Sequence, residues 1–239
     1  YAEVVRGFPQ VDEIIPLDRA IFRSKNPASI CEKTFRLLFR LRQCGFSRVI
    51  DFQGYGETEM LAWWSGAPER WGQAYRPSRG WAYTQSLPRQ RASHPVEQNL
   101  ALLRRCGLCV KKIHNQYSLP AEAAVEARRF FKANNLGIGR PTLFLQPFTS
   151  SPHKNWPLEN YLALARHYQS QGVQIIFGGS PSESRALEPV RFADFCVAAG
   201  VSLAVAAGLM NFSTLIIGGD TGLLHLATAM GRRTLMLMR

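Results

Sequence analysis

Three polar clusters each follow an apolar segment with the character of a buried strand, and their residue types suit the binding of an anion. The members are Thr149, Ser150, Ser151 and Lys154; residues 180–183, ending in Glu183; and Asp220, Thr221, Gly222 and His225. Hydroxyl, ammonium and imidazole groups donate hydrogen bonds that phosphate oxygens accept. Each cluster alone also fits an ordinary surface loop, so the coincidence of all three is what indicates a ligand site.

The third cluster begins a predicted helix over residues 221–230. Asp220 is a suitable N-cap for this helix, and Gly222 removes a side chain where a ligand would approach. A helix N-terminus carries roughly half a positive charge from its aligned peptide dipoles, which makes it an anion site. His225 lies one turn further on and would face the ligand. The alternative is a capped helix with a polar histidine and no ligand.

The first and second clusters offer complementary groups. Lys154 follows three hydroxyl residues and precedes a helix that begins near Pro157, so it could clamp a diphosphate. The sequence contains no G-x-x-x-x-G-K-[ST] motif, which excludes a P-loop. Glu183 follows two glycines at a strand end, where a carboxylate can accept both hydroxyls of a ribose. A solvated lysine and a surface glutamate are the alternatives.

The elements that must position these clusters alternate between strand and helix. Apolar runs predict strands at residues 142–146, 173–177, 215–217 and 234–238, separated by helices near 157–171, 202–210 and 221–230. This alternation predicts a parallel sheet covered by helices on both faces. Ligands of such sheets lie beyond the carboxyl ends of the strands. The three clusters fall at those ends.

The first 139 residues follow a looser pattern. We expect strands at 11–17 and 48–52, helices at 27–45, 56–64, 96–106 and 121–134, and an irregular region rich in Pro and Arg at 67–93. Loop signals between 134 and 141 predict a boundary between domains 1–139 and 140–239. Because the chain starts at Tyr1 and stops in an apolar run, we expect a fragment open at both ends.

Charge favours an anionic partner. The chain carries 29 Lys and Arg against 17 Asp and Glu, and 21 of the basic residues precede residue 140. Nucleotides, phosphorylated saccharides and an anionic membrane all suit such a field. The basic residues are scattered, and the sequence has no RNA-binding aromatic signature or paired Cys/His finger, so we expect no nucleic acid partner.

Two further patterns have ordinary explanations. The five cysteines are irregularly spaced, and Cys106 and Cys109 with His114 lack the fourth ligand of a structural zinc site. The uncharged stretch 196–219 is long enough to span a bilayer. Gly, Ser and Asn residues interrupt it, however, and favour a Ser-capped helix followed by a buried strand.

The order and spacing of the motifs resemble the C-terminal domain of the heptosyltransferases of glycosyltransferase family 9. The motifs are Lys154-Asn-Trp-Pro157, Gly178-Gly-Ser-Pro-Ser-Glu183 and Asp220-Thr-Gly-Leu-Leu-His225-Leu-Ala-Thr-Ala229. Looser similarity continues through Phe8-Pro-Gln-Val-Asp-Glu-Ile-Ile15, Val49-Ile-Asp-Phe-Gln-Gly54 and Ser65-Gly-Ala-Pro-Glu-Arg-Trp-Gly72. The resemblance therefore covers nearly the whole chain, and its most specific part is residues 144–231.

This resemblance implies an α/β protein of the GT-B architecture, with two Rossmann-like domains of which the N-terminal one is incomplete. It implies inverting, metal-independent transfer of a heptose from an ADP-activated donor to a lipopolysaccharide inner core, with no cofactor besides that nucleotide-sugar substrate. Thr149, Ser150 or Ser151 and Lys154 would hold the donor phosphates, and Glu183 the ribose. Asp220, Thr221, Gly222 and His225 would lie against the sugar and diphosphate.

The resemblance also implies where catalysis resides. Lys154 would stabilise the leaving group, while the general base belongs to a loop expected upstream of Tyr1. The counterpart of Asp51 in the family is structural, although it too ends a strand. An anionic glycolipid acceptor would place the enzyme in the cytoplasm, peripherally on the inner face of the inner membrane.

Other functions remain open at this stage. A Rossmann oxidoreductase or epimerase requires G-x-G-x-x-G after a strand, whereas Gly137 and Gly139 precede one. A GT-B homologue that uses another nucleotide sugar has the same motifs. So does an inactive homologue that only binds a sugar nucleotide or glycan.

Overall fold

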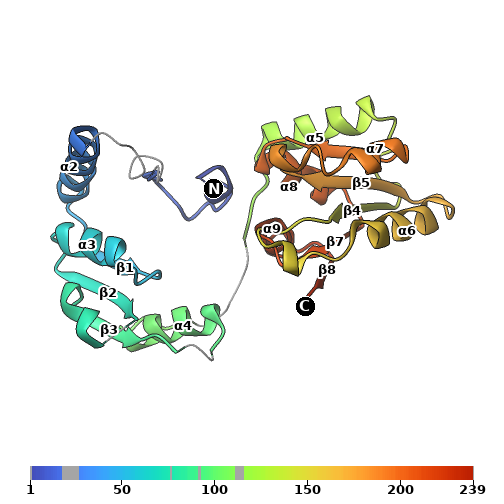
Figure 1. Cartoon of the computed structure of the whole chain (residues 1–239). Coiled ribbons are helices and arrows are strands. Elements are labelled where there is room, and N and C mark those ends of the chain that lie inside the picture. Colours follow the sequence, from blue (N-terminus) through green and yellow to red (C-terminus); the bar gives the residue numbers. More distant parts are fainter. Residues whose placement is uncertain (1, 18–26, 76, 91–92, 111–115, 239) are drawn as a thin grey trace. The chain divides into compact units, whose positions relative to one another are not determined.

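The computed structural model describes residues 2–17, 27–75, 77–90, 93–110 and 116–238 (Figure 1). The chain forms two compact units. Unit 1 combines Tyr1–Pro16 with His114–Arg239, and unit 2 is Leu17–Ile113.

Unit 1 contains a fully parallel five-stranded sheet with the order β6-β5-β4-β7-β8. Its strands are β4 (Thr142–Gln146), β5 (Gln174–Gly179), β6 (Cys196–Ala199), β7 (Leu215–Gly219) and β8 (Thr234–Leu237). The predicted parallel sheet is therefore confirmed. After β4, the next two strands along the chain, β5 and β6, lie on one side of β4, whereas β7 and β8 lie on its other side. The strand order therefore reverses between β4 and β7, which is the switch point of the sheet.

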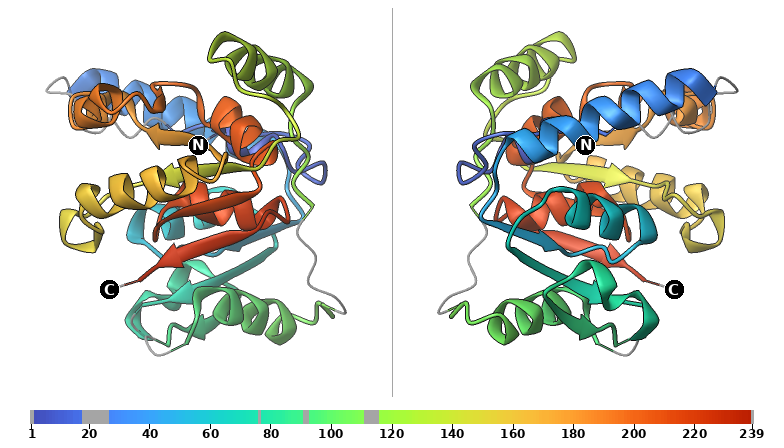
Figure 2. Two further views of the ribbon diagram at one scale, coloured as in Figure 1. Left: turned by 90° about the vertical axis from the view of Figure 1, so that its right-hand side faces the viewer. Right: turned by 90° about the vertical axis from the view of Figure 1, so that its left-hand side faces the viewer.

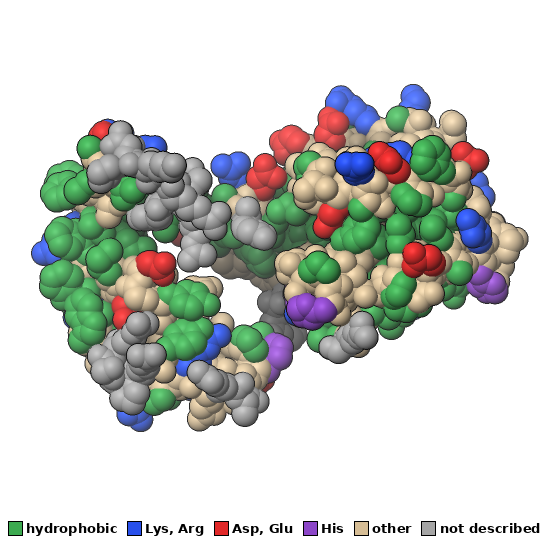
Figure 3. Space-filling model, in the orientation of Figure 1, with side chains coloured by type: hydrophobic (Ala, Val, Ile, Leu, Met, Phe, Trp, Pro, Cys, Tyr) green, Lys and Arg blue, Asp and Glu red, His purple; other side chains and the backbone are tan. Residues whose placement is uncertain are grey.

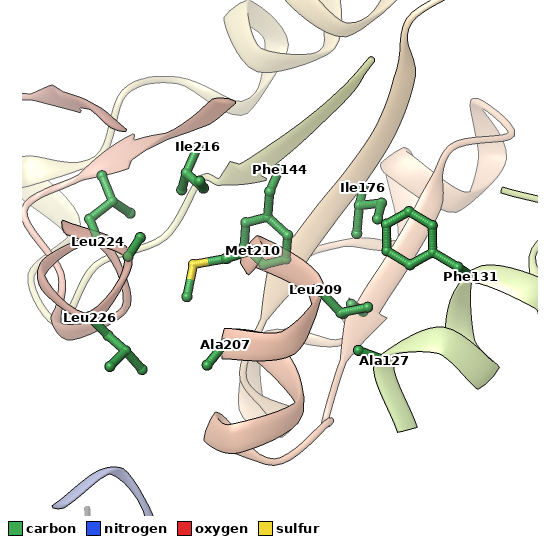
Figure 4. Packing of buried hydrophobic residues seen from close by; sticks show 12 residues of the cluster. Ala127, Phe131, Phe144, Ile176, Ala207, Leu209, Met210, Ile216, Leu224 and Leu226 are labelled. Carbon is green, nitrogen blue, oxygen red and sulfur yellow. The ribbon is translucent and has the colours of Figure 1, made fainter. Parts of the chain in front are cut away.

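Helices cover both faces of this sheet (Figure 2). They are α5 (Ala121–Ala133), α6 (Leu158–Gln169), α7 (Glu188–Phe192), α8 (Leu203–Asn211) and α9 (Gly222–Ala229), with the short α1 (Ala2–Val5) beside α8. Alternate residues of β4 point to opposite sides, as the pleat requires. Phe144 packs with α5, α8 and α9, whereas Leu145 packs with α6 and α7. Figure 4 shows the first of these cores, with Phe144 between Ile176 and Ile216.

The uncharged stretch at 196–219 folds as predicted into globular elements. It forms β6, the helix α8 and β7, and the Ser202 hydroxyl caps α8 by accepting from the Val205 N–H at 3.1 Å. Ala206 to Met210 are buried in the core. Among the described residues, no helix is long and apolar enough to cross a membrane.

Unit 2 is built around a three-stranded parallel sheet with the order β1-β2-β3. The strands are β1 (Arg48–Asp51), β2 (Glu69–Ala74) and β3 (Gln85–Pro88). The helices are α2 (Pro27–Gln43), α3 (Gly56–Trp64) and α4 (Pro95–Arg105), with a 3-10 helix at Pro77–Ala82. The helices match the predictions within two residues.

The structure corrects three sequence-based expectations. Residues 11–17 form no strand. The region 67–93, predicted to be irregular, contains β2 and β3, and β6 was not predicted at all. β2 escaped prediction because polar Gln73 and Gly72 occupy buried positions in it, which interrupts the apolar pattern.

The division into units falls near residue 113, whereas the sequence predicts a boundary at residue 139. The difference arises from α5, which the predicted boundary assigns to the N-terminal part. In the structure α5 packs on α8 of unit 1, and Gly208 permits the close approach. A Cβ atom at Gly208 would lie 2.7 Å from the Cβ of Ala127 and 2.8 Å from the carbonyl oxygen of Ala123.

We predict that Gly208→Ala destabilises the protein by about 1–2 kcal/mol, because overpacking costs about 1–3 kcal/mol and better helix propensity returns at most about 1 kcal/mol. Gly222→Ala is the matched control, since a Cβ there meets no atom within 4 Å. Urea denaturation measures both. Equal stability of the two variants would contradict the close α5–α8 contact.

Candidate functional site

The site lies where the carboxyl ends of β4 and β7 meet in unit 1. The two strands pair in parallel, with Gln146 opposite Gly218, so the segments that follow them lie side by side. A Cβ atom at Gly219 would lie 2.5 Å from Cγ2 of Thr149, which shows how closely the two loops approach. The structure thus brings together two of the three predicted clusters.

Lys154, Asp220 and His225 form one hydrogen-bonded group. The Lys154 Nζ lies 3.1 Å from Oδ2 of Asp220, and the Nε2 of His225 lies 3.0 Å from Oδ1 of the same carboxylate. A carboxylate only accepts, so His225 carries a proton on Nε2 and donates it. The Lys154 ammonium, followed by the His225 ring, holds the pKa of the Asp220 carboxyl below its ordinary value.

The start of α9 offers backbone donors beside this group. Thr221 is the N-cap, and its hydroxyl accepts from the Leu224 N–H at 3.4 Å. The sequence predicted Asp220 as the cap, which is wrong, because its carboxylate is taken by Lys154 and His225 instead. With the Leu224 N–H capped, the first-turn N–H groups of Gly222 and Leu223 remain for a ligand or solvent. Gly222 borders open space.

The loop after β4 is held by its own hydrogen bonds. The Thr149 N–H donates to Oδ1 of Asn155 at 2.9 Å, and the Thr149 hydroxyl donates to the Ser151 carbonyl at 2.8 Å. Ser150 is exposed, and the Ser151 hydroxyl lies 3.2 Å from the His153 ring. Thr149 therefore shapes the loop, while Ser150 is exposed and its hydroxyl has no described role in holding the loop.

Glu183 lies at the end of β5, the neighbour of β4 on its other side. Its Oε2 accepts from the Ser180 N–H at 2.7 Å and forms a capping box with Ser180. This contact uses one carboxylate oxygen and fixes the direction of the side chain. The role of Glu183 toward a ribose stays a prediction.

Sequence reasoning did not predict the residues that line the cavity beside Lys154. A cavity of about 570 Å³ opens beside Lys154, and Trp156, Asn160 and Met238 line it. Trp156 is fixed by an edge-on contact with Tyr161, at 4.9 Å between ring centroids. The sequence did contain a signal for Trp156, because this residue follows Lys154 by two positions in the segment after a predicted strand. Asn155 was missed in the same way.

Neither a disulfide nor a metal centre appears in the part of the chain that the structure describes. All five cysteines are free, and His114 lies outside the described residues. No three His, Cys, Asp or Glu side chains among the described ones gather as a metal site.

Donors gathered at the switch point of a parallel sheet form the kind of site that suits an anionic ligand such as a nucleotide. The family follows from comparison with known proteins. The model of glycosyltransferase family 9 (heptosyltransferase) matches residues 34–238, so the chain belongs to that family. Lipooligosaccharide heptosyltransferase 2 of Haemophilus influenzae is 31% identical over 122 residues, covering 47% of this chain and 35% of that protein. The match thus spans about a third of that relative's length.

Solved structures share the fold. A family 9 glycosyl transferase from Veillonella parvula has a TM-score of 0.85 at 22% identity, covering 98% of this chain and 68% of its own. The E. coli heptosyltransferase II and the E. coli heptosyltransferase WaaC, the latter solved with ADP, both have TM-scores of 0.77 at 21% and 24% identity. These two matches cover 97% and 98% of this chain and 71% and 74% of theirs. The likeness confirms the expected GT-B fold.

We predict that Lys154→Ala raises the pKa of the Asp220 carboxyl toward its ordinary value, while Lys132→Ala leaves it unchanged. Because the folded-state pKa is lower than the unfolded-state one, these contacts stabilise the fold above the unfolded pKa. That contribution is lost as the pH falls through the folded pKa. A ¹³C NMR titration of the carboxyl measures the shift, and identical titrations in wild type and Lys154→Ala would rule out the ion pair in solution.

Proposed function

We propose that the whole protein is a glycosyltransferase that transfers a heptose from an ADP-activated donor to a lipopolysaccharide inner-core acceptor. The observation that supports this most is the convergence of Lys154, His225 and the start of α9 at one point of the sheet. The Lys154 ammonium and the backbone N–H groups at the start of α9 match the charge of a diphosphate. The structure of the E. coli relative WaaC has been solved with ADP and with ADP-2-deoxy-2-fluoro heptose.

In this proposal Asp220 positions Lys154 and His225, and the other predicted residues face the donor or shape the loops. Lys154 has three N–H donors and uses one on Asp220, which leaves two for phosphate oxygens. We propose that the N–H groups at Gly222, the hydroxyl of Ser150 and the ring of His225 lie around the same phosphates. Thr149, Ser151 and Thr221 shape the loops, and Glu183 receives the ribose.

The proposed reaction is an inverting displacement at the anomeric carbon. The acceptor oxygen forms a bond to that carbon as the bond to the diphosphate oxygen breaks, and negative charge grows on the departing ADP. Lys154 and the N-terminus of α9 stabilise that charge, since preorganised donors act most strongly where charge develops. In this proposal a general base upstream of Tyr1 in the full-length protein takes the acceptor proton. No metal or further cofactor is part of the proposal.

We predict that Lys154→Ala in the full-length protein lowers transfer roughly 100-fold, the scale of losing one such donor. Wild type and variant are compared on ADP-, UDP- and GDP-sugars for binding and turnover, with Lys132→Ala as the control for loss of a surface charge. A loss below about threefold would remove Lys154 from the mechanism. Preference for UDP or GDP would reject an ADP-heptose donor, and binding without turnover would identify an inactive module.

The proposed acceptor is an anionic glycolipid, which places the protein on the inner face of the inner membrane. Unit 2 supports this, because residues 17–113 carry 17 Lys and Arg against 7 Asp and Glu. An anionic leaflet attracts such a surface with about 1 kcal/mol per basic residue near it.

We therefore predict salt-sensitive binding of the full-length protein to vesicles that contain anionic lipids, measured by co-sedimentation. Neutral vesicles of the same size should bind at least several-fold less, since the attraction is electrostatic. Equal binding to both kinds of vesicle, or none to either, would contradict peripheral docking by charge.

A further inference from the structure

Unit 2 exposes large apolar side chains on the outer side of two neighbouring helices, and the roles proposed above do not use them. On α2, Phe35 is 63% exposed and Phe39 is 56% exposed. The two are one turn apart, and both lie about 200° around the helix from Leu37, which is half-buried. Phe35 and Phe39 therefore lie in the middle of the solvent-facing side of α2 and not at the margin of its buried side.

The same pattern continues on α3. Met60 and Trp63 are exposed and one turn apart, whereas Ala62, about 200° around the helix from Met60, is buried. α3 packs beside α2 and beside the 3-10 helix at Pro77–Ala82, whose Trp81 is 59% exposed. The rings of Trp63 and Trp81 lie 5.8 Å apart between centroids. We call the following five side chains the aromatic face: Phe35, Phe39, Met60, Trp63 and Trp81.

These side chains form a group. Figure 3 shows hydrophobic side chains gathered over α2 and α3. Single exposed apolar residues are normal on a protein surface, but a contiguous group of them marks a place where another molecule or a membrane binds. The group therefore calls for an occupant.

Basic side chains border the aromatic face. α2 carries four Lys and Arg against one Glu, and all four basic side chains are exposed. Arg36 lies beside the stripe that Phe35 and Phe39 form, and it pairs with Glu32 at 2.8 Å. Arg42 continues the stripe by one turn. The aromatic face thus combines apolar rings with a border of positive charge.

A hollow of about 470 Å³ opens at the end of the aromatic face, and Arg42, Trp63, Trp64 and Arg70 line it. Arg70 is held in place, because its Nε donates to the Ala82 carbonyl at 2.7 Å. In the described part of the chain, the Arg42 guanidinium makes one hydrogen bond, from Nη1 to the Trp64 carbonyl at 3.4 Å. A guanidinium pairs bidentately with a phosphate. The hollow therefore suits a phosphate group.

Aromatic rings bordered by arginines are typical of a surface that lies on a lipid bilayer. Trp and Phe side chains favour the boundary between lipid headgroups and acyl chains, and basic side chains are attracted to anionic headgroups. A second copy of this chain fits less well. A two-fold contact through the aromatic face would bring two basic borders together, and like charges repel.

We propose that unit 2 docks on an anionic membrane through the aromatic face, with the rings in the headgroup region and Arg42 paired with a lipid phosphate. This rests on the peripheral docking proposed above and assigns it to particular side chains. Charge attracts the protein to the leaflet, and burial of the rings adds to the affinity.

The test is co-sedimentation of the full-length protein with vesicles of phosphatidylcholine and phosphatidylglycerol, without donor or acceptor. We expect the double variants Phe35→Ser/Phe39→Ser and Trp63→Ser/Trp81→Ser each to lower binding roughly tenfold or more, because two rings are no longer buried in lipid. Neither double variant changes the net charge, so electrostatics alone predicts no loss. Phe192→Ser is the matched control, since Phe192 is 85% exposed and belongs to unit 1, and it should bind as wild type does.

The arginine is tested in the same assay. Arg42→Gln should lower binding several-fold, because it removes hydrogen bonds to a lipid phosphate as well as a charge. Arg104→Gln removes the same charge from an exposed position on α4 of the same unit, and it should have a smaller effect. Equal losses in the two variants would contradict the pairing of Arg42 with a phosphate.

Thermal melting by circular dichroism shows whether the variants fold, and we expect unchanged transitions because the five side chains are exposed. Wild-type binding by both double variants would overturn the proposal. Dimers of the wild type that both double variants dissociate, with vesicle binding unchanged, would also overturn it and identify a second copy as the occupant. Binding to vesicles requires no donor, so absence of transfer from ADP-sugars would reject the proposed reaction and leave this result unaffected.

Discussion

The parallel pairing of β4 with β7 is the constraint on which the candidate site depends. Lys154 and Asp220 are 66 residues apart, yet they meet because their strands are neighbours in the sheet. The pairing tolerates little beyond glycine at its end: a Cβ atom at Gly218 would lie 2.6 Å from the Gln146 carbonyl oxygen. Gly218 and Gly219 therefore do more than end a strand. They let the loop after β4 and the start of α9 close on the same point.

Asp220 determines the electrostatics of that point. A lone carboxylate next to a diphosphate would repel it, but this one accepts from both Lys154 and His225. The ion pair compensates the carboxylate charge and holds both donors in place, at the cost of part of the attraction that Lys154 offers a ligand. The net attraction then depends on the two remaining N–H groups of Lys154 and on the start of α9. Asp220 is thus better described as the group that positions the donors than as a contact of the ligand itself.

Sequence reasoning succeeded where one physical signal dominates. β4 is buried at all five positions, and its run of apolar residues predicted both its limits and its central place. β6 was not predicted, because it is only four residues long and its apolar sequence continues into the apolar helix α8. The prediction of the N-cap of α9 was wrong for another reason. Asp220 and Thr221 are both good capping residues, and the choice between them depends on Lys154 and His225, which only the tertiary structure brings near.

The two units show how the same sheet geometry provides two kinds of chemistry. In both, residues directly beyond parallel strands gather at the carboxyl edge, and glycines allow the loops to approach the neighbouring strand. In unit 1 the gathered groups are an ion pair, a histidine and a helix start, which suit phosphate oxygens. In unit 2 the same edge presents the stacked rings of Tyr55 and Tyr75 with the guanidinium of Arg89, and buried Asp51 accepts from the Tyr83 hydroxyl beneath them. The residues that follow the strands, and not the sheet itself, therefore decide whether this edge presents hydrogen-bond donors or an aromatic stack.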